Sequence, residues 1–309
     1  MERRRIGSLE VTVVGLGCNN FGGRLDAAGT QAVVDAALEA GINFFDTADI
    51  YGGARSEELL GRALGKRREQ VIVATKFGLP LDEQRQGASP DYVRRAVEDS
   101  LRRLGTDRID LYQLHRPDPK TPIADTLAAL DGLVRAGKVR EIGCSNFSAP
   151  QLREAQAAVE PGAVRFVSVQ NQYSLIDRTP DREVLAECAR SGLGFLPYFP
   201  LASGLLSGKY RRGQAPPPGS RLSTADARRG EGFLSDRNLE AAEALEAFAI
   251  SRGHTLLELA ISWLASREPV SSVIAGATKP DQVRANVAAV GWRLDAEERA
   301  AVDRIAPPP

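Results

Sequence analysis

Short apolar runs alternate with amphipathic segments along almost the whole chain, and this alternation restricts the fold more than any other feature. Runs such as VIVATK and IDLYQLH are strand-like, and apolar residues recur at helical spacing in the segments between the runs. Strands that alternate with helices are typical of a parallel sheet with crossover helices. Eight such pairs predict an α/β protein whose sheet closes into a (β/α)8 TIM barrel. A doubly wound sheet is the alternative fold.

The predicted elements follow one another without a change in composition, so we expect a single barrel domain over residues 1–309. Ser56 and Ser89 are expected to cap the second and third helices. A β-hairpin at 4–13 precedes the barrel, and two extra helices, 238–250 and 296–305, lie outside the repeat. The barrel strands are expected at 13–17, 43–46, 71–76, 109–115, 139–145, 166–171, 194–198 and 272–275. The barrel helices are expected at 30–40, 56–64, 90–104, 122–136, 150–159, 181–190, 256–265 and 280–290.

Charge and composition exclude several classes of protein. Lys and Arg number 40 and Asp and Glu number 40, and a formal net charge of zero argues against binding to nucleic acid or an anionic membrane. Three widely spaced cysteines form neither a disulfide framework nor a CxxC metal site, and only two histidines argue against a metal centre. We find no signal peptide and no apolar run long enough to span a membrane, so we expect a cytoplasmic protein.

Four polar residues fall at or just after the ends of consecutive predicted strands. Asp46 ends the second strand in FFDTADIYG, and Tyr51 lies five residues later. Lys76 ends the third strand, and His115 ends the fourth strand in DLYQLHRPD. Active sites of such barrels are built at the carboxyl ends of the strands, so these four side chains are the candidate catalytic residues. Each alone is more simply a turn, surface or structural residue; the combination favours chemistry.

The four side chains suit the reduction of a carbonyl, which needs a hydride donor and a proton donor. Tyr51 would donate the proton, and a cation about 4 Å away favours its phenolate by about 4 kcal/mol, which lowers a pKa by about three. Lys76 would be that cation, and Asp46 would keep it charged and oriented. His115, neutral, would orient the carbonyl and stabilise negative charge on its oxygen.

Several motifs resemble those of the aldo-keto reductase superfamily. They are FFDTADIYGGARSEELLGRAL, VIVATKFG, RIDLYQLHRPD, GCSNFS, VQNQYSL, PLASGLLSGKY and IAGATKPDQVRANVAA, and they extend from the second strand to the last helix. The resemblance implies a nicotinamide-dependent oxidoreductase that acts on a small carbonyl or alcohol, with NADP(H) as the expected cofactor and NAD(H) possible. It leaves a second role open, because potassium channel beta subunits resemble this family too and would sense the cofactor.

The resemblance also implies cofactor-binding residues. Ser145, Asn146 and Gln170 match positions that bind the nicotinamide carboxamide, and Tyr198 matches the aromatic residue that stacks on the nicotinamide ring. The positions along the pyrophosphate are Pro200, Leu201, Ser203, Gly204, Leu205 and Lys209. The positions at the adenosine end are Gly276, Thr278, Lys279, Gln282 and Asn286.

The sequence departs from the family pattern at the adenosine end. Gln282 stands where several relatives have a phosphate-binding Arg, and Ala285 replaces an acidic residue. The grip on a 2′-phosphate would then depend on Thr278 and Lys279, with help from Arg284. These departures weaken the expectation of NADP(H).

Substrate-binding residues are inferred only from their place near strand ends. The candidates are Asn20, Phe21, Phe77 and Arg116, together with Tyr173 and the Pro-, Gly- and Arg-rich segment 211–233. Oligomeric state and the substrate itself stay open. GLGCNNFGG at 15–23 resembles a dinucleotide fingerprint, but Asn20 occupies the last glycine position of GxGxxG, so we reject a Rossmann site.

Overall fold

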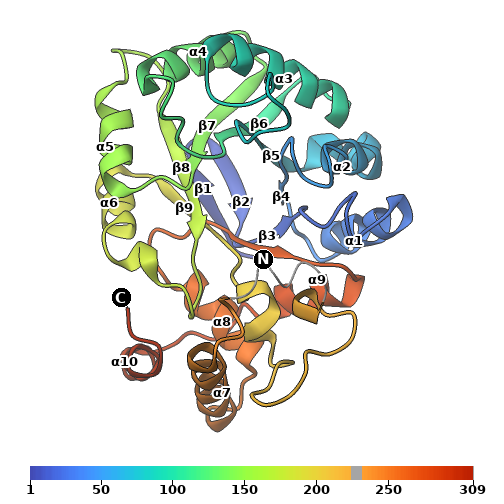
Figure 1. Cartoon of the computed structure of the whole chain (residues 1–309), viewed down its shortest axis with the longest axis vertical. Coiled ribbons are helices and arrows are strands. Elements are labelled where there is room, and N and C mark those ends of the chain that lie inside the picture. Colours follow the sequence, from blue (N-terminus) through green and yellow to red (C-terminus); the bar gives the residue numbers. More distant parts are fainter. Residues whose placement is uncertain (224–231, 309) are drawn as a thin grey trace.

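Eight parallel strands form the barrel in the computed structural model, which describes residues 1–223 and 232–308. Neighbouring strands follow the order β10-β3-β4-β5-β6-β7-β8-β9 (Figure 1). The barrel closes where Phe195 of β9 bridges to Val270, just before β10. This architecture confirms the predicted (β/α)8 barrel. The strands are β3 (Val14–Gly17), β4 (Phe44–Asp46), β5 (Ile72–Phe77), β6 (Ile109–Leu114), β7 (Val139–Ser145), β8 (Phe166–Gln172), β9 (Gly194–Tyr198) and β10 (Val273–Gly276).

Helices surround the barrel and bury its outer face (Figure 1). The third of these helices, at 90–104, has typical start and stop residues. Ser89 accepts from the Tyr92 amide, Pro90 occupies the first turn, and Gly105 ends the helix with φ 64°. The helices that follow the strands are α1 (Ala27–Glu39), α2 (Ser56–Leu64), α3 (Pro90–Leu104), α4 (Ile123–Arg135), α5 (Ala149–Ala157), α6 (Val184–Ser191), α8 (Leu256–Ala265) and α9 (Pro280–Ala288). Short 3₁₀ helices are η1 (Gly65–Gln70), η2 (Thr179–Asp181), η3 (Ala202–Ser207) and η4 (Arg221–Ser223).

The predicted hairpin is present and covers the amino-terminal end of the barrel. It pairs β1 (Arg3–Ile6) with β2 (Leu9–Thr12). Ile6, Leu9 and Val11 are buried in one apolar cluster with residues of the barrel strands, namely Phe44, Ala74, Leu111, Val167, Leu196 and Ile274. Because the hairpin fills this end, the carboxyl ends of the strands form the accessible end of the barrel.

Two extra helices, α7 (Asp236–Ser251) and α10 (Ala296–Ile305), lie outside the strand–helix repeat, as predicted, and α7 contacts both α8 and α10 (Figure 1). Arg178 binds α10 to the rest of the fold through Asp303 and the carbonyl of Ala306. Residues 224–231 of the predicted loop 211–233 lie outside the described residues. Among the helices of the described residues, none combines the length and the apolar character needed to cross a membrane.

Two predicted helix starts and one predicted cap were wrong. Helix α1 begins three residues earlier than predicted, because Asp26 accepts from the Gly29 amide at 2.8 Å and caps it. Helix α2 begins at Ser56 as predicted, but Ser56 does not cap it, because the cap position is Arg55 and the hydroxyl of Ser56 donates to the carbonyl of Cys18. The predicted helix 181–190 divides into η2 and α6, because Asp181 binds Arg178 and Arg267.

Candidate active site

The four candidate catalytic residues lie on neighbouring elements at the open end of the barrel. Asp46 ends β4, Lys76 is next to last in β5, and His115 directly follows β6, while Tyr51 lies in the loop between β4 and α2. Strands β4, β5 and β6 are adjacent in the sheet. Their carboxyl ends therefore bring the four side chains together, as the sequence predicted.

Lys76 connects three parts of this group. Its side chain is fully buried, and its Nζ lies 2.7 Å from Oδ2 of Asp46, 2.8 Å from the carbonyl oxygen of Thr47 and 3.3 Å from the hydroxyl of Tyr51. Burial alone would lower the pKa of Lys76, but Asp46 and Tyr51 together outweigh burial and raise the pKa above its usual value. Lys76 is therefore a charged ammonium in contact with the tyrosine.

Asp46 has two further donors on its other oxygen. Gln170 Nε2 donates to Oδ1 at 2.8 Å, and Gln113 Nε2 lies 3.3 Å from the same atom. All three side chains are buried. An ionised carboxylate out of water needs such partners, and the lysine together with two amides supplies them.

The expected effect of Lys76 on Tyr51 needs correction. Burial raises the pKa of Tyr51 above its usual value, and the opposing effect of the nearby Lys76 ammonium does not overcome it. Tyr51 is therefore a fully protonated phenol at neutral pH in this state. Lys76 still has the predicted effect of lowering the pKa of Tyr51, because its ammonium stabilises the phenolate, but this effect is smaller than that of burial.

His115 is a neutral imidazole in this site. Burial lowers its pKa to about 2, and the positive charges of Lys76 and Arg116 add to the effect. Its ring meets the ring of Tyr51 edge-on, with centroids 5.8 Å apart. Its Nδ1 is buried without a hydrogen-bond partner among the described residues. A neutral ring keeps one N–H to donate, as the sequence predicted for an orienting group.

The residues predicted to bind the nicotinamide form one network beside these groups. Asn146 has φ 63° and donates to the carbonyl of His115 at 2.9 Å, and it accepts from the Tyr198 hydroxyl at 2.8 Å. The hydroxyl of Ser145 donates to the carbonyl of Gln170. Strands β7, β8 and β9 thus continue the ring of polar groups around the barrel mouth from β6.

The segment after β9 has the backbone of an anion cradle. Phe199, Ala202, Ser203 and Gly204 all have positive φ values, and a Cβ on Gly204 would come within 3.0 Å of the Lys209 ammonium. Successive left-handed residues turn amide groups in one direction, and an ammonium beside them favours a pyrophosphate. Leu205 and Pro200 are buried, so only their backbones can take part; Leu201 is half-buried. The residues present fit the diphosphate of a nicotinamide cofactor.

The predicted adenosine-binding residues surround the start of α9. Thr278 and Lys279 lie at the turn after β10, Gln282 lies in the first turn of α9, and Gly276 is exposed at the end of β10. Asn286 is buried within α9. Because β10 pairs with β3 and approaches β9, these residues follow those of β7, β8 and β9 around the barrel mouth. The predicted cofactor-binding residues thus form one continuous row.

Most candidates for the substrate wall do not line the mouth. Phe77 is fully buried and stacks on Tyr112, because the residue after the inward-facing Lys76 points to the helix side of β5. Phe21 lies in the core, and Tyr173 is buried against Phe195 and Trp263. These three interpretations were wrong.

The two remaining candidates have different surroundings. Asn20 is buried and donates to the carbonyl of Ala277, so it belongs to the β10 end rather than to the substrate wall. Arg116 is exposed beside His115, and its role in substrate binding stays a prediction.

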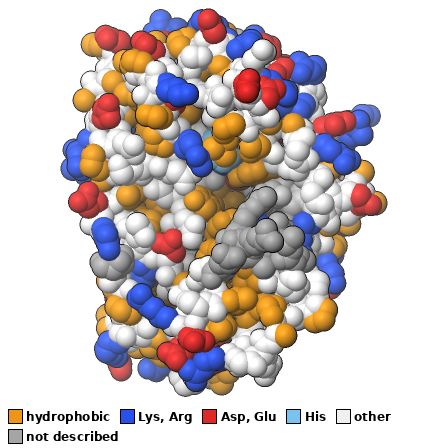
Figure 2. All heavy atoms as spheres, viewed as in Figure 1, with side chains coloured by type: hydrophobic (Ala, Val, Ile, Leu, Met, Phe, Trp, Pro, Cys, Tyr) orange, Lys and Arg blue, Asp and Glu red, His pale blue; other side chains and the backbone are white. Residues whose placement is uncertain are grey.

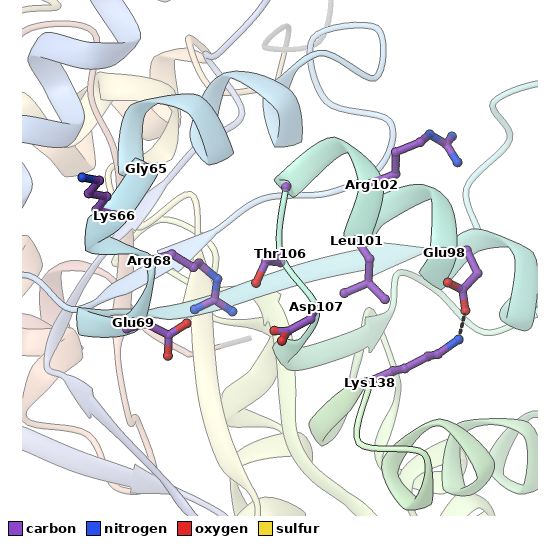
Figure 3. A pocket seen from close by; sticks show the side chains of 11 residues that line it. Gly65, Lys66, Arg68, Glu69, Glu98, Leu101, Arg102, Thr106, Asp107 and Lys138 are labelled. Atoms are coloured by element: carbon purple, nitrogen blue, oxygen red, sulfur yellow. Dashed lines mark hydrogen bonds and ion pairs between the residues drawn. The ribbon is translucent and has the colours of Figure 1, made fainter.

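The shape of the surface adds two observations. On the face drawn in Figure 2, hydrophobic side chains gather around a hollow near the middle, and charged side chains of both signs are spread around them. A separate cavity of about 860 Å³ lies near the amino-terminal ends of β5 to β7, lined by Lys66, Arg68, Arg102 and Lys138 among others (Figure 3). It contains none of the candidate catalytic residues.

Gln113 is the polar residue of the site that the sequence analysis did not identify. It lies two residues before His115 in β6, so both face the barrel interior. The signal was present, since a glutamine within the apolar strand IDLYQL is unusual unless it has a buried partner.

Comparison with known proteins places the chain in a group of related sequences. The model of the Aldo/keto reductase family matches residues 13–307. A probable voltage-gated potassium channel subunit beta from Oryza sativa subsp. japonica is 36% identical, with 87% of this chain and 84% of the relative covered. The uncharacterized oxidoreductase YrpG from Bacillus subtilis is 35% identical, with 97% and 94% covered. A probable potassium channel subunit beta from Arabidopsis thaliana is 34% identical, with 94% and 91% covered.

Proposed function

The chain belongs to the aldo/keto reductase family, and we propose that it reduces the carbonyl of an aldehyde, ketone or sugar to an alcohol, or catalyses the reverse oxidation. The observation that carries this proposal is the position of the Lys76 ammonium, which is buried, paired with Asp46 and 3.3 Å from the Tyr51 hydroxyl. This ammonium neutralises Asp46 and is also placed to stabilise negative charge that develops on the tyrosine oxygen.

Tyr51 is the proton donor in the proposed mechanism. Its buried phenol keeps its proton until a carbonyl oxygen accepts it, and Lys76 then stabilises the phenolate that remains. Asp46 holds the ammonium of Lys76 in place. His115 donates a hydrogen bond to the same carbonyl oxygen and stabilises the negative charge that forms on it.

A nicotinamide cofactor, when bound, supplies the hydride that reduces the carbonyl carbon. Ser145 and Asn146 would hold its carboxamide, together with the oxygen of the Gln170 amide, since the nitrogen of this amide already binds Asp46. Tyr198 would lie against the ring. The segment 199–205 and Lys209 would hold the diphosphate.

NADP(H) is the proposed cofactor, with NAD(H) as a second choice. Lys279 is exposed at the start of α9 and free to meet a 2′-phosphate. Arg284, in contrast, already lies 3.1 Å from Asp281 and 3.5 Å from Glu39. We therefore propose a modest preference for the phosphorylated cofactor.

Substitution of Tyr51 by Phe tests the proposal. The wild type should oxidise NADPH with at least one member of a panel of aldehydes, ketones and sugars, and Tyr51→Phe should lower kcat by about 10²- to 10⁴-fold. Binding of NADPH, followed by protein fluorescence, should change less than about threefold. An unchanged kcat in Tyr51→Phe would remove the assigned proton donor.

A regulatory subunit is the second candidate function, because two relatives are named as probable potassium channel subunits. Such a protein would bind the nicotinamide cofactor and transmit its redox state to a partner. It would bind NADPH but turn over no carbonyl of the panel at a rate that depends on Tyr51. The panel experiment therefore distinguishes the two functions.

A further inference from the structure

A buried carboxyl group lies two residues before Tyr51 and plays no part in the mechanism above. Asp49 is 1% exposed, and neither of its carboxylate oxygens has a hydrogen-bond partner among the described residues. An ionised carboxylate in such a place would bear a large desolvation cost. Its protonation state therefore matters for the structure around it.

The groups that face Asp49 come from every element around it. Glu57 of α2 is fully buried, and it accepts from Thr75 Oγ1 and from Arg103 Nε, each at 2.6 Å. Arg103 of α3 thus already has a carboxylate partner. Lys76 of β5 is also near, but it is paired with Asp46.

Two tyrosines complete these surroundings. Tyr112 of β6 has a buried hydroxyl without a partner among the described residues, and Tyr92 of α3 lies close enough to interact with the charge of Asp49. Neither brings a positive charge to Asp49.

The buried charges around Asp49 do not balance if Asp49 and Glu57 are both ionised. Two carboxyl groups, Asp49 and Glu57, share one arginine that binds only Glu57. Burial, and then repulsion by Glu57, raise the pKa of Asp49 to about 7. The two oxygens without partners and the single arginine thus indicate that Asp49 carries a proton in the folded protein below about pH 7.

The backbone connects Asp49 to Tyr51. The Asp49 amide donates to the carbonyl of Lys76 at 3.1 Å, and the Tyr51 amide donates to the carbonyl of Ala48 at 3.2 Å. One turn therefore carries both side chains and is attached to the residue that contacts the Tyr51 hydroxyl. Movement of Asp49 towards water or Arg103 would displace this turn.

We propose that Asp49 is a positioning residue that, in its protonated form, holds Tyr51 in the reactive geometry and releases it when the carboxyl group ionises. The effect on Tyr51 depends on the proposed function, whereas the buried proton on Asp49 does not. The two parts therefore need separate measurements.

Thermal stability tests the buried proton without any substrate. Between about pH 4, the usual pKa of Asp, and pH 7, the folded protein keeps a proton that the unfolded chain releases, so stability falls as pH rises. The melting temperature of Asp49→Asn should exceed that of the wild type by about 4 °C more at pH 8 than at pH 5. The matched control Asp107→Asn, which removes an exposed carboxylate, should follow the wild type.

The rate of turnover tests the link to Tyr51. Wild-type kcat should fall by up to about tenfold between pH 6 and pH 8, because about one tenth of Asp49 stays protonated one pH unit above its pKa. The kcat of Asp49→Asn should change less than about twofold over this pH range. The Kd of the wild type for NADPH should not change in parallel with the fall in kcat. Neither His115 nor Tyr51 titrates there, given the directions of their pKa values.

A second variant keeps the proposal falsifiable if Asp49→Asn folds poorly. Glu57→Gln removes the competing carboxylate and frees Arg103 to pair with Asp49. The fall in kcat with rising pH should therefore move to lower pH than in the wild type.

A wild-type kcat that does not change between pH 6 and pH 8, together with a pH-dependent difference in melting temperature between wild type and Asp49→Asn, would overturn the link to Tyr51. Equal melting behaviour of wild type and Asp49→Asn would overturn the buried proton. Absence of any turnover would instead count against the proposed function.

Discussion

The side-chain amide of Gln170 donates to Oδ1 of Asp46 at 2.8 Å, while Oδ2 of the same carboxylate binds Lys76. One buried carboxylate thus joins a proposed cofactor-binding residue to the lysine beside the proposed proton donor. A cofactor carboxamide that binds Gln170 would meet an amide whose orientation is already fixed. The catalytic and cofactor-binding halves of the mouth are therefore built as one network rather than as two separate sites.

Replacement of Lys76 by Met should affect both stability and catalysis. The variant leaves Asp46 buried with only two amide donors, and loss of one member of a buried ion pair costs about 3–5 kcal/mol in free energy of unfolding. The phenolate of Tyr51 also loses its stabilising cation, so kcat should fall by about 10²-fold or more. Urea denaturation and turnover measurements check the two effects.

The double variant Asp46→Asn with Lys76→Met is the control for that experiment. It removes both charges, so most of the lost stability should return while turnover stays low. If the single variant Lys76→Met were as stable as the wild type, the Asp46 carboxylate would not depend on this lysine.

His115 should make the protein sensitive to acid. Because its pKa is lowered to about 2 in the folded protein, the unfolded chain binds a proton below about pH 6.5 that the folded protein does not. Stability therefore falls as pH decreases below about 6.5. His115→Gln should lose about 2 kcal/mol less in free energy of unfolding than the wild type between pH 6.5 and pH 4.5.

The other histidine provides a matched comparison. His254 lies at the start of α8, stacked on Trp292 and half-exposed. His254→Gln, which replaces a histidine outside the barrel mouth, is the control for loss of an imidazole in the same urea titrations. Equal slopes in wild type and His115→Gln would show that His115 is protonated in the folded state.

The barrel and its four candidate catalytic residues could be predicted because both depend on local signals. Alternating apolar runs and helical segments determine the order of elements, and a polar residue that ends a strand must lie at the mouth. Asp46, Lys76 and His115 satisfied this rule, and the structure brings them together with Tyr51.

The substrate wall could not be predicted in the same way, because closeness to a strand end does not define which face a side chain occupies. Phe77 follows Lys76 directly, and successive residues of a strand face opposite sides, so Phe77 faces the helices and contacts Tyr112 of the neighbouring strand β6. The pKa of Tyr51 likewise depends on burial by side chains distant in sequence, which the spacing of Lys76 and Tyr51 does not reveal. Tertiary packing decided both.

A glycine in α2 should be intolerant of substitution. A Cβ on Gly61 would lie 2.2 Å from the carbonyl oxygen of Leu104 at the end of α3, so α2 and α3 would have to separate. Gly61→Ala should lower the free energy of unfolding by about 3 kcal/mol. Gly132→Ala in α4, where a Cβ meets nothing within 4 Å, should instead raise it by about 0.5–1 kcal/mol. Stabilisation by Gly61→Ala would contradict the close contact of the two helices.

The cofactor preference should be small in the wild type and adjustable at Gln282. Gln282 Oε1 accepts from the Thr278 amide at 2.7 Å and from its hydroxyl at 3.1 Å, so it occupies the donors of that residue. An exposed Lys279 contributes at most about 1 kcal/mol to a 2′-phosphate, which corresponds to about fivefold tighter binding of NADPH than of NADH. Titrations of protein fluorescence with each cofactor measure this ratio.

Gln282→Arg should raise that ratio to about 50-fold, because a guanidinium can bind a phosphate with two parallel hydrogen bonds and the released Thr278 can donate as well. The Kd for NADH should change less than about twofold, since the new charge has no phosphate to meet at the ribose. Arg284→Gln is the matched control, and it should change the ratio less than about twofold because Arg284 is already paired with Asp281 and Glu39. A wild type that binds NADPH about 100-fold more tightly than NADH would mean that Arg284 leaves both acids to bind the phosphate, and Arg284→Gln would then abolish the preference.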